Sequence, residues 1–337
     1  MIFRAKEHTA LAGGPWNERR ARYAIADVVD EAVAAGPPDE AGVYAGVAGA
    51  AYALRSLGTD VAWDNGTGEG PGFADGEVGI ALASRDVERF RAAAAACIAD
   101  PWNELLYGAA GALVAARLLG TEAIAREAIR HLWSTWSYDS KLRACIWTES
   151  FDGKRRQFLG FAHGVAGNAY AMFRAASLQS REHQTELVQR VVETLERTAV
   201  RDGALANWPP EPQSPATDIR VQWCHGAAGV VCALAGAPAH RALDALLLAA
   251  GELVWEAGPL RKSAGLCHGT AGNGWAFLKL NARTRDRKWL ERARRFAMHA
   301  IEQRTGEPGL WSGDLGLALY LRACIEADDR LPLLDVL

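Results

Sequence analysis

Apolar residues recur along this chain with the period of an α-helix. In residues 283–302 they fall three or four positions apart, and Arg and Glu occupy the opposite face. The apolar positions there are Trp289, Leu290, Ala293, Phe296, Ala297, Ala300 and Ile301. A second stripe of this kind in residues 185–197 is made of Leu187, Val188, Val191, Val192 and Leu195. We find no sustained strand-like alternation, so the pattern predicts amphipathic helices and an all-α fold.

A second pattern occurs seven times: two variable residues, then Gly-x-x-Gly, then a run of small or apolar residues. The leading glycines are Gly46, Gly76, Gly108, Gly164, Gly226, Gly269 and Gly313. The trailing glycines are Gly49, Gly79, Gly111, Gly167, Gly229, Gly272 and Gly316. Each run predicts a buried helix that begins at its glycine pair, where the backbone passes close to a neighbouring segment. The unequal spacing indicates one repeated unit with variable connections.

Buried helices therefore alternate with amphipathic ones, and such hairpins either stack in an open solenoid or close into a ring. An open solenoid needs polar terminal copies, whereas the first and last copies here are as apolar as the others. We expect a closed α/α toroid of seven inner and seven outer helices, forming a single domain over residues 1–337. Two stretches rich in turn-forming residues, 149–160 and 201–222, predict long loops before the fourth and fifth copies.

The composition is that of a globular protein. Of 337 residues 50% are hydrophobic and 23% are charged, and the net charge is −3. Lys and Arg are scattered, which argues against a nucleic-acid partner. No apolar stretch approaches the roughly 20 residues of a transmembrane segment. The N-terminus lacks a signal-peptide core, and the 6 cysteines form no disulfide framework, so we expect a cytoplasmic protein.

The candidate chemistry lies in the two residues before each leading glycine, which share one end of the ring if the ring closes. In copies four to six these positions hold His163, Cys224, His225, Cys267 and His268. Two thiolates and an imidazole suit zinc, and three protein ligands leave a fourth position open, as in catalytic sites. The alternative is that the cysteines are core residues and the histidines cap helices. The repetition of Cys-His-Gly at equal register favours a metal. His225 remains open as a ligand, a neighbour of the ligands or a proton donor.

Several segments resemble the lanthionine synthetase C-like family, which contains the LanC cyclases and their stand-alone LanC-like relatives. The most specific are GFAHGVAGN at 160–168, QWCHGAAGV at 222–230 and GLCHGTAGNGWAF at 265–277. ELLYGAAG at 104–111 and LRKSAGLCHG at 260–269 are closer to the stand-alone branch. The resemblance covers essentially the whole chain and implies an α/α toroid.

The resemblance also implies roles for individual residues. It implies that Cys224, Cys267 and His268 are the zinc ligands. His163 corresponds to a catalytic acid or base. It implies further catalytic or substrate-binding positions at Glu104, Arg220, Lys262 and Arg4, the last two for glutathione in the LanC-like branch. Two simpler alternatives are that Arg220 pairs with Asp218 and that Glu104 caps a helix.

The expected reaction is the addition of a thiol to a dehydroamino acid. Zinc lowers the pKa of a thiol from its usual value of about 8.5, and His163 accepts and returns a proton. Arg220 stabilises the enolate, and His163 or His225 protonates the α-carbon. The substrate is a dehydrated peptide or protein, and the thiol belongs either to that peptide or to glutathione or another small thiol. A separate dehydratase or kinase-lyase enzyme must supply the dehydrated partner.

Two other classes of protein compete with this interpretation. An adaptor or small-thiol-binding protein on a helical scaffold would hold a structural zinc, with His225 as its fourth protein ligand. A prenyltransferase β-subunit is another zinc-containing toroid, but its ligands include an Asp and its repeats lack the Cys-His-Gly pairs, so we rank it last.

Overall fold

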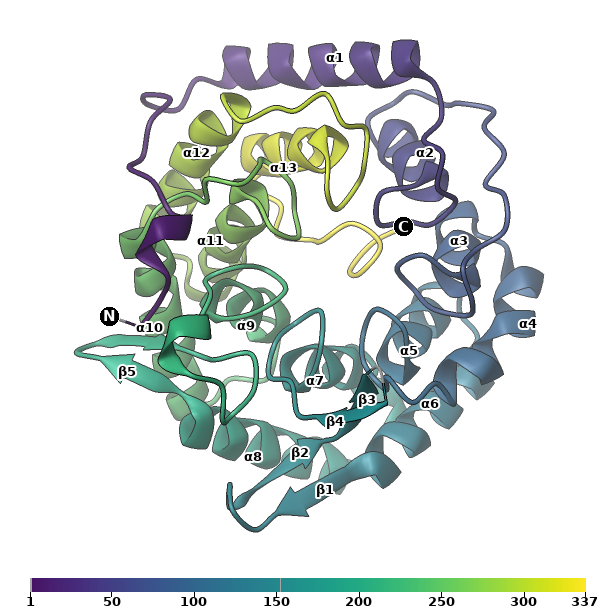
Figure 1. Cartoon of the computed structure of the whole chain (residues 1–337), viewed down its shortest axis with the longest axis vertical. Helices are drawn as coiled ribbons and strands as arrows, with labels where there is room; N and C mark the ends of the chain where they lie inside the picture. Colours follow the sequence, from purple (N-terminus) through teal and green to yellow (C-terminus); the bar gives the residue numbers. More distant parts are fainter. Residues whose placement is uncertain (1, 152) are drawn as a thin grey trace.

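The computed structural model describes residues 2–151 and 153–337 and contains thirteen α-helices in this part of the chain, arranged as a ring (Figure 1). Seven of them start directly after the leading glycine of a copy: α2 (Val47–Ser56), α3 (Glu77–Ser84), α5 (Ala109–Leu118), α7 (Val165–Arg174), α9 (Ala227–Leu234), α11 (Thr270–Thr284) and α13 (Asp314–Glu326). Each packs against the next, and α13 packs against α2. The inner ring is therefore closed, as the apolar terminal copies predict.

The other helices lie outside this ring: α1 (Glu18–Ala35), α4 (Val87–Ile98), α6 (Glu122–Thr135), α8 (Arg181–Thr198), α10 (Arg241–Ala257) and α12 (Arg287–Ile301). Residues 57–76, between α2 and α3, contain no helix, so the described residues hold six outer α-helices rather than the expected seven. Helix α12 begins at Arg287, later than the start of the range 283–302 in which its apolar stripe lies, because the Asp286 side chain accepts a hydrogen bond from the Lys288 amide and caps it.

Short strands occur in the stretches expected to be irregular. Three antiparallel pairs are formed by β1 (Trp136–Asp139) with β2 (Ala144–Trp147), β3 (Glu149–Phe151) with β4 (Lys154–Arg156), and β5 (Val200–Asp202) with β6 (Leu205–Asn207). The expectation of an all-α chain is corrected to a mostly helical one. Strands of three or four residues are too short to show a two-residue period in the sequence.

A close backbone approach explains the trailing glycine of every copy. A Cβ atom built on Gly272 would lie 1.7 Å from the carbonyl oxygen of Leu266, and one on Gly229 would lie 2.0 Å from that of Trp223. The other five copies repeat this approach to the carbonyl six residues earlier. Any side chain would collide with this turn, so the repeat preserves glycine. Of the leading glycines, Gly164 and Gly226 have φ of +103° and +98°.

Backbone hydrogen bonds join the copies at the end of the ring where the inner helices begin. Each bond joins the residue two positions before a leading glycine to the residue at the same position in an adjacent copy, and the donor–acceptor distances are 2.9 to 3.3 Å. The bonds run from Ala74 to Leu106, Tyr44 to Ala74, Trp311 to Tyr44, Cys267 to Trp311 and Ala162 to Cys224, amide first. This belt brings the residues before the glycines to one face. Among the described residues it has no bond between Cys224 and Cys267.

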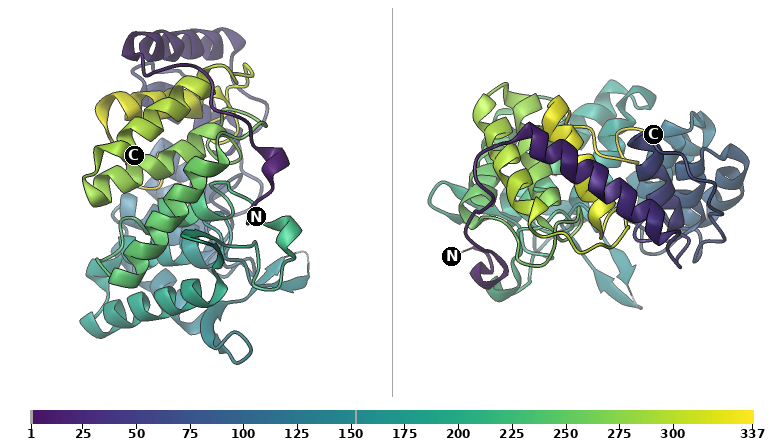
Figure 2. Two further views of the ribbon diagram at one scale, coloured as in Figure 1. Left: turned by 90° about the vertical axis from the view of Figure 1, so that its left-hand side faces the viewer. Right: turned by 90° about the horizontal axis from the view of Figure 1, so that it is seen from above.

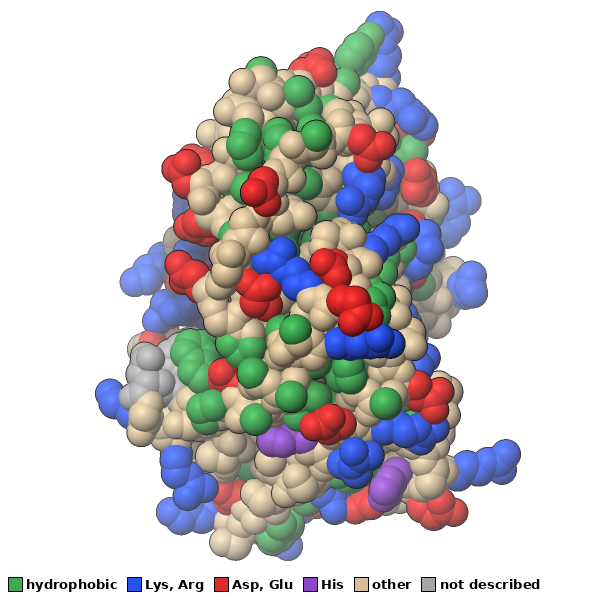
Figure 3. Space-filling model, turned by 90° about the vertical axis from the view of Figure 1, so that its right-hand side faces the viewer, with side chains coloured by type: hydrophobic (Ala, Val, Ile, Leu, Met, Phe, Trp, Pro, Cys, Tyr) green, Lys and Arg blue, Asp and Glu red, His purple; other side chains and the backbone are tan. Residues whose placement is uncertain are grey.

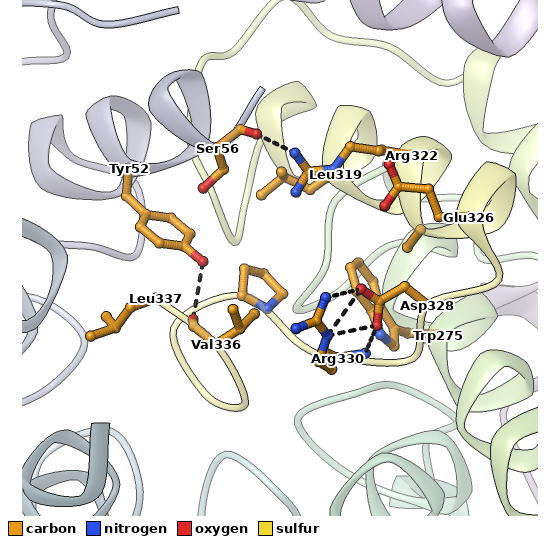
Figure 4. A pocket seen from close by; sticks show the side chains of 12 residues that line it. Tyr52, Ser56, Trp275, Leu319, Arg322, Glu326, Asp328, Arg330, Val336 and Leu337 are labelled. Carbon is orange, nitrogen blue, oxygen red and sulfur yellow. Dashed lines mark hydrogen bonds and ion pairs between the residues drawn. The ribbon is translucent and has the colours of Figure 1, made fainter. Parts of the chain in front are cut away.

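The C-terminal segment crosses the ring near the other ends of the inner helices (Figure 1). Buried Lys279 of α11 pairs there with Asp335 at 2.7 Å and with Asp329 at 3.2 Å. The Tyr170 hydroxyl donates to Asp335 at 2.9 Å, and the Tyr52 hydroxyl donates to the carbonyl of Val336 at 3.1 Å. A cavity of about 310 Å³ lies beside this segment (Figure 4). Hydrogen bonds to α2 and α7 and ion pairs to α11 therefore anchor the segment.

The outer surface is polar and mixed in charge. Helix α1 runs along the rim beside α12 and α13 (Figure 2). On the face in Figure 3, acidic and basic side chains are interspersed. Among the described helices, none combines the length and the apolar character needed to cross a membrane.

Candidate metal centre

Two cysteines and a histidine converge where α9 and α11 begin. The ligand atoms of Cys224, Cys267 and His268 all lie within 4.8 Å of one another. Both cysteines are buried, at 4% and 2% exposure, while His268 is half-buried. The Cys267 Sγ lies 3.8 Å from the His268 Nε2. The predicted convergence of these three side chains is therefore confirmed, and they form a possible metal site.

The two thiols behave as one acid-base unit. A hydrogen bond from Cys267 lowers the pKa of Cys224 well below its usual value, against the effect of burial and with further help from His268. Burial, followed by the hydrogen bond to Cys224, raises the pKa of Cys267. The pKa values of the two thiols are therefore displaced in opposite directions, which makes Cys224 the more acidic of the pair. Two cysteines and a histidine are a donor set that fits zinc, which binds thiolates in place of their protons.

A tyrosine from the first copy contacts the histidine of this cluster. The Tyr44 hydroxyl lies 3.1 Å from the His268 Nδ1, on the opposite side of the imidazole from the Nε2 that faces Cys267. The two rings meet edge to face, with centroids 6.5 Å apart. Burial raises the pKa of Tyr44 far above its ordinary value, so the phenol keeps its proton. Tyr44 and Cys267 therefore lie on opposite sides of the His268 imidazole.

His163 is paired with a buried carboxylate in the neighbouring part of the ring. Its Nδ1 lies 3.2 Å from the Glu104 Oε2. Glu104 is fully buried and also accepts hydrogen bonds from the amides of Leu106 and Tyr107, at 2.9 and 2.8 Å. Burial lowers the pKa of His163, but the charge and hydrogen bond of Glu104 outweigh this effect, and the net pKa is raised. Glu104 thus holds His163 in one orientation.

His225 lies beside His163 rather than among the clustered ligand atoms. The two imidazole rings stack with centroids 5.6 Å apart, and the ring of Phe158 lies 5.7 Å from His163 and 5.8 Å from His225. Burial is the main cause that lowers the pKa of His225 to about 4. The cluster found among the described residues consists of Cys224, Cys267 and His268, and does not include His225. His225 is therefore a neutral neighbour of this cluster.

The expected cationic residues differ in exposure and in the groups that their charges act on. Arg220 is half-buried, and its charge contributes to the lowered pKa of His225. Lys262 is exposed, and its charge slightly favours the thiolate of Cys267. Arg4 is held by Glu7 at 3.0 Å and by Asp218 at 2.6 Å. Among the described residues Asp218 pairs with Arg4, and no ion pair joins Arg220 to Asp218, so the alternative pairing is not found.

Sequence reasoning missed a buried carboxyl group close to this site. Glu149 of β3 is 1% exposed, and neither of its side-chain oxygens has a hydrogen-bond partner among the described residues. Burial, followed by the charges of Glu104 and Glu211, raises its pKa well above the usual value. The next residue, Ser150, donates its amide to the carbonyl of Pro101 at 2.8 Å, which ties β3 to the loop that carries Glu104. No sequence pattern distinguishes this glutamate from the charged residues around it.

The fold and the site together define a class of protein: a closed ring of helices whose N-termini gather two thiols and an imidazole beside a His–Glu pair. Comparison with known families identifies the class. The model of the "Lanthionine synthetase C-like protein" family matches residues 79–331. The chain belongs to this family.

Relatives and solved structures agree with that assignment. The chain is 33% identical over 150 residues to "Glutathione S-transferase LANCL1" of Danio rerio, covering 44% of this chain and 36% of that protein. It is 32% identical over 209 residues to "LanC-like protein GCL1" of Arabidopsis thaliana, covering 58% of this chain and 46% of that protein. The matched stretches thus span less than half the length of these relatives. The structure of "Nisin cyclase", an α/α toroid, superposes with a TM-score of 0.66 at 15% identity, over 94% of this chain and 95% of that one, which shows a common fold.

Proposed function

We propose that this chain catalyses the zinc-dependent addition of a thiol to a dehydroamino acid in a peptide or protein. The observation that carries the proposal is the convergence of Cys224, Cys267 and His268 beside the pair of His163 and Glu104. In our proposal residues 1–337 act as one toroidal domain, because the C-terminal segment is anchored to helices from three different copies.

Zinc fits the metal cluster by its chemistry. Cys224, Cys267 and His268 would hold the ion, and zinc would supply stabilisation of a substrate thiol as its thiolate. Three protein ligands leave room for such a thiol. The burial of both cysteines excludes bulk water, which strengthens the interaction of charged groups with one another.

His163 is the proposed carrier of the proton. Its Nδ1 lies 3.2 Å from the Glu104 Oε2, and in our proposal its imidazole accepts and later returns the proton. In the addition, the substrate thiol loses its proton to the imidazole of His163, and a bond forms between sulfur and the β-carbon. The π electrons of the double bond move to the carbonyl oxygen as an enolate. The proton then passes from His163 to the α-carbon, either directly or through His225, which gives up one proton and takes the proton of His163 in exchange, so the reaction balances.

Two kinds of cationic residue complete the proposed site. Arg220 stabilises the developing enolate, since it is the guanidinium whose charge reaches the His163–His225 side of the ring. Lys262 and Arg4 contact the anionic part of a small thiol. Arg4 would then exchange part of its present pairing with Glu7 and Asp218 for the ligand.

The thiol has two candidate sources. A cysteine of the same dehydrated peptide would give a lanthionine ring, which would make the chain a peptide cyclase. A small thiol such as glutathione would give an intermolecular thioether, and this source is favoured by the name of the zebrafish relative, a glutathione S-transferase, and by the position of Lys262. In both cases a separate dehydratase or kinase-lyase enzyme supplies the dehydroamino acid.

The competing function is an adaptor or glutathione-binding protein with a structural zinc. Such a site needs a fourth protein ligand. His225 was the candidate for that role, and its stacking against His163 favours the catalytic interpretation instead.

The deciding experiment is incubation of the zinc-loaded protein with a dehydrated peptide that contains one cysteine, with and without glutathione. Mass spectrometry distinguishes the two products, because glutathione addition increases the mass and ring closure does not. Loss of free thiols reports ring closure. The absence of both products, with zinc bound at one ion per chain, would favour the adaptor.

His163→Ala tests the proton carrier. We expect the rate of thioether formation to fall by about 10²- to 10⁴-fold, while the zinc content stays at one ion per chain. His183→Ala is the control, because His183 lies at the start of outer helix α8 and not at the ring mouth. An unchanged rate for His163→Ala would remove this residue from the reaction.

A further inference from the structure

Tyr44 contacts the metal cluster from the opposite end of the sequence. It occupies the position before the glycine pair of the first copy, whereas the three candidate ligands come from copies five and six. Its hydroxyl is 3.1 Å from the His268 Nδ1. Its carbonyl accepts a hydrogen bond from the amide of Trp311 at 2.9 Å, and the carbonyl of Trp311 accepts one from the amide of Cys267 at 2.9 Å. Side chain and backbone thus tie Tyr44 to two of the three ligands.

With a metal bound at Nε2, the contact between Tyr44 and His268 fits the tautomer of His268 that carries its proton on Nδ1. A histidine that binds a metal through Nε2 carries its proton on Nδ1 and donates it to a neighbouring acceptor. The phenol oxygen of Tyr44 is such an acceptor, and the Nε2 on the other side of the ring faces Cys267 at 3.8 Å. Without the hydroxyl, the imidazole gains freedom to rotate and to exchange tautomers, and both changes weaken metal binding.

We propose that Tyr44 is a positioning residue of the metal centre, which holds His268 with its Nε2 directed at the metal and so couples closure of the ring to metal affinity. This inference rests on the proposed zinc site. It assigns to the first copy, which contributes no ligand, a direct effect on the affinity for zinc.

The test compares Tyr44→Phe with Tyr107→Phe. Tyr107 belongs to the corresponding pair of the third copy, is also half-buried, and donates its hydroxyl to Asp75 at 3.0 Å instead of to a ligand. Zinc dissociation constants are measured on metal-free protein by competition with a chromogenic chelator. We expect Tyr44→Phe to weaken zinc binding by about 10- to 100-fold and Tyr107→Phe to change it less than about twofold. Melting temperatures of the metal-free proteins report whether each variant is folded.

A spectroscopic measurement on the unaltered protein provides a second test. In histidine-labelled, zinc-loaded protein, long-range ¹H–¹⁵N spectra should show His268 bound through Nε2, with an Nδ1 proton that exchanges slowly with water. Tyr44→Phe should accelerate that exchange. Coordination through Nδ1 in the unaltered protein would overturn the proposal even if the variant did not fold.

Cys224→Ala separates failure of this inference from failure of the proposed function. Loss of zinc in Cys224→Ala together with unchanged affinity in Tyr44→Phe would refute only the role of Tyr44. Retention of stoichiometric zinc in Cys224→Ala would refute the metal centre itself.

Discussion

The two ends of the ring both hold clusters of polar groups, but they differ in how these groups are partnered. At the far end, buried Lys279 is matched by Asp335 and Asp329, and Asp335 also accepts from Tyr170. At the end where the helices begin, Cys224 and Cys267 shift each other's pKa in opposite directions, and the buried Glu149 oxygens have no hydrogen-bond partner among the described residues. Matched charges indicate a structural role, whereas groups with competing or missing partners indicate a binding or catalytic role.

The difference follows from the direction of the inner helices. The turns before the inner helices direct side chains to a common face. No regular backbone pattern supplies hydrogen-bond partners for the polar side chains on this face. Lys279 lies about 15 Å further along α11 from Gly269, at 1.5 Å per residue, and is covered by the C-terminal segment. Our proposal therefore places the chemistry at one end and a structural ion-pair cluster at the other, and variants should affect one end without the other.

The largest expected effect is the loss of the metal. Cys267→Ala should abolish zinc binding, because two ligands cannot hold the ion at the same affinity. Cys232→Ala is the matched control, since Cys232 is a buried cysteine within α9 whose pKa is raised by burial. Metal analysis after dialysis should give close to one zinc per chain for the control and none for Cys267→Ala. Equal zinc contents in Cys267→Ala and Cys232→Ala would refute the assignment of the metal to this end of the ring.

The second effect concerns the far end. Lys279→Met leaves Asp335 buried without its main counter-ion and should lower the free energy of unfolding by about 3–5 kcal/mol. Arg330→Ala removes an exposed partner of Asp328 and should cost less than about 1 kcal/mol. Denaturant unfolding measures both values. Zinc content should be the same in the two variants. A loss of zinc in Lys279→Met, measured at a temperature at which the variant remains folded, would show that the two ends of the ring are coupled.

The smallest effect sharpens the interpretation of Glu149. The pKa of Glu149 is raised in the folded chain. As the pH rises above the ordinary value of 4.5, the Glu149 carboxyl therefore ionises more readily in the unfolded chain, and this difference destabilises the folded state. Glu149→Gln removes this effect and should raise the melting temperature more at pH 8 than at pH 5. Near pH 4 the variant and the parent protein should differ little. Destabilisation by the same amount at both pH values would instead indicate a specific hydrogen bond made by the carboxyl group.

The sequence predicted the inner ring and the metal cluster because both follow from local rules. Each glycine pair marks the start of a helix, and residues at equal register in a closed ring must share one end. Cys224, Cys267 and three histidines could therefore be predicted to share one end of the ring, and the choice of His268 among the histidines came from the family resemblance. The start of α12 depended on the side-chain cap at Asp286, which the apolar stripe does not report.

The remaining features depend on contacts between segments far apart in the chain. Asp218 pairs with Arg4, which lies 214 residues away in the chain, and not with the nearby Arg220. The periodicity of the sequence does not predict such a distant contact. The burial of Glu149 depends on a hairpin whose strands have three residues each. The repeat predicts that Tyr44 lies at the same end of the ring as the ligands. It does not predict the contact with His268, because that contact joins the first copy to the sixth.

The contact between the first and last copies also has a consequence for synthesis on the ribosome. The hydrogen-bond partner of Tyr44, Trp311, lies 267 residues later in the chain. At a synthesis rate of about 5–20 residues per second, Trp311 is made roughly 15 to 50 s after Tyr44. The edge of α2 that later meets α13 stays uncovered throughout that time. A nascent chain of this protein therefore needs either a chaperone at that edge or enough solubility to remain incomplete, because the circle cannot be completed copy by copy.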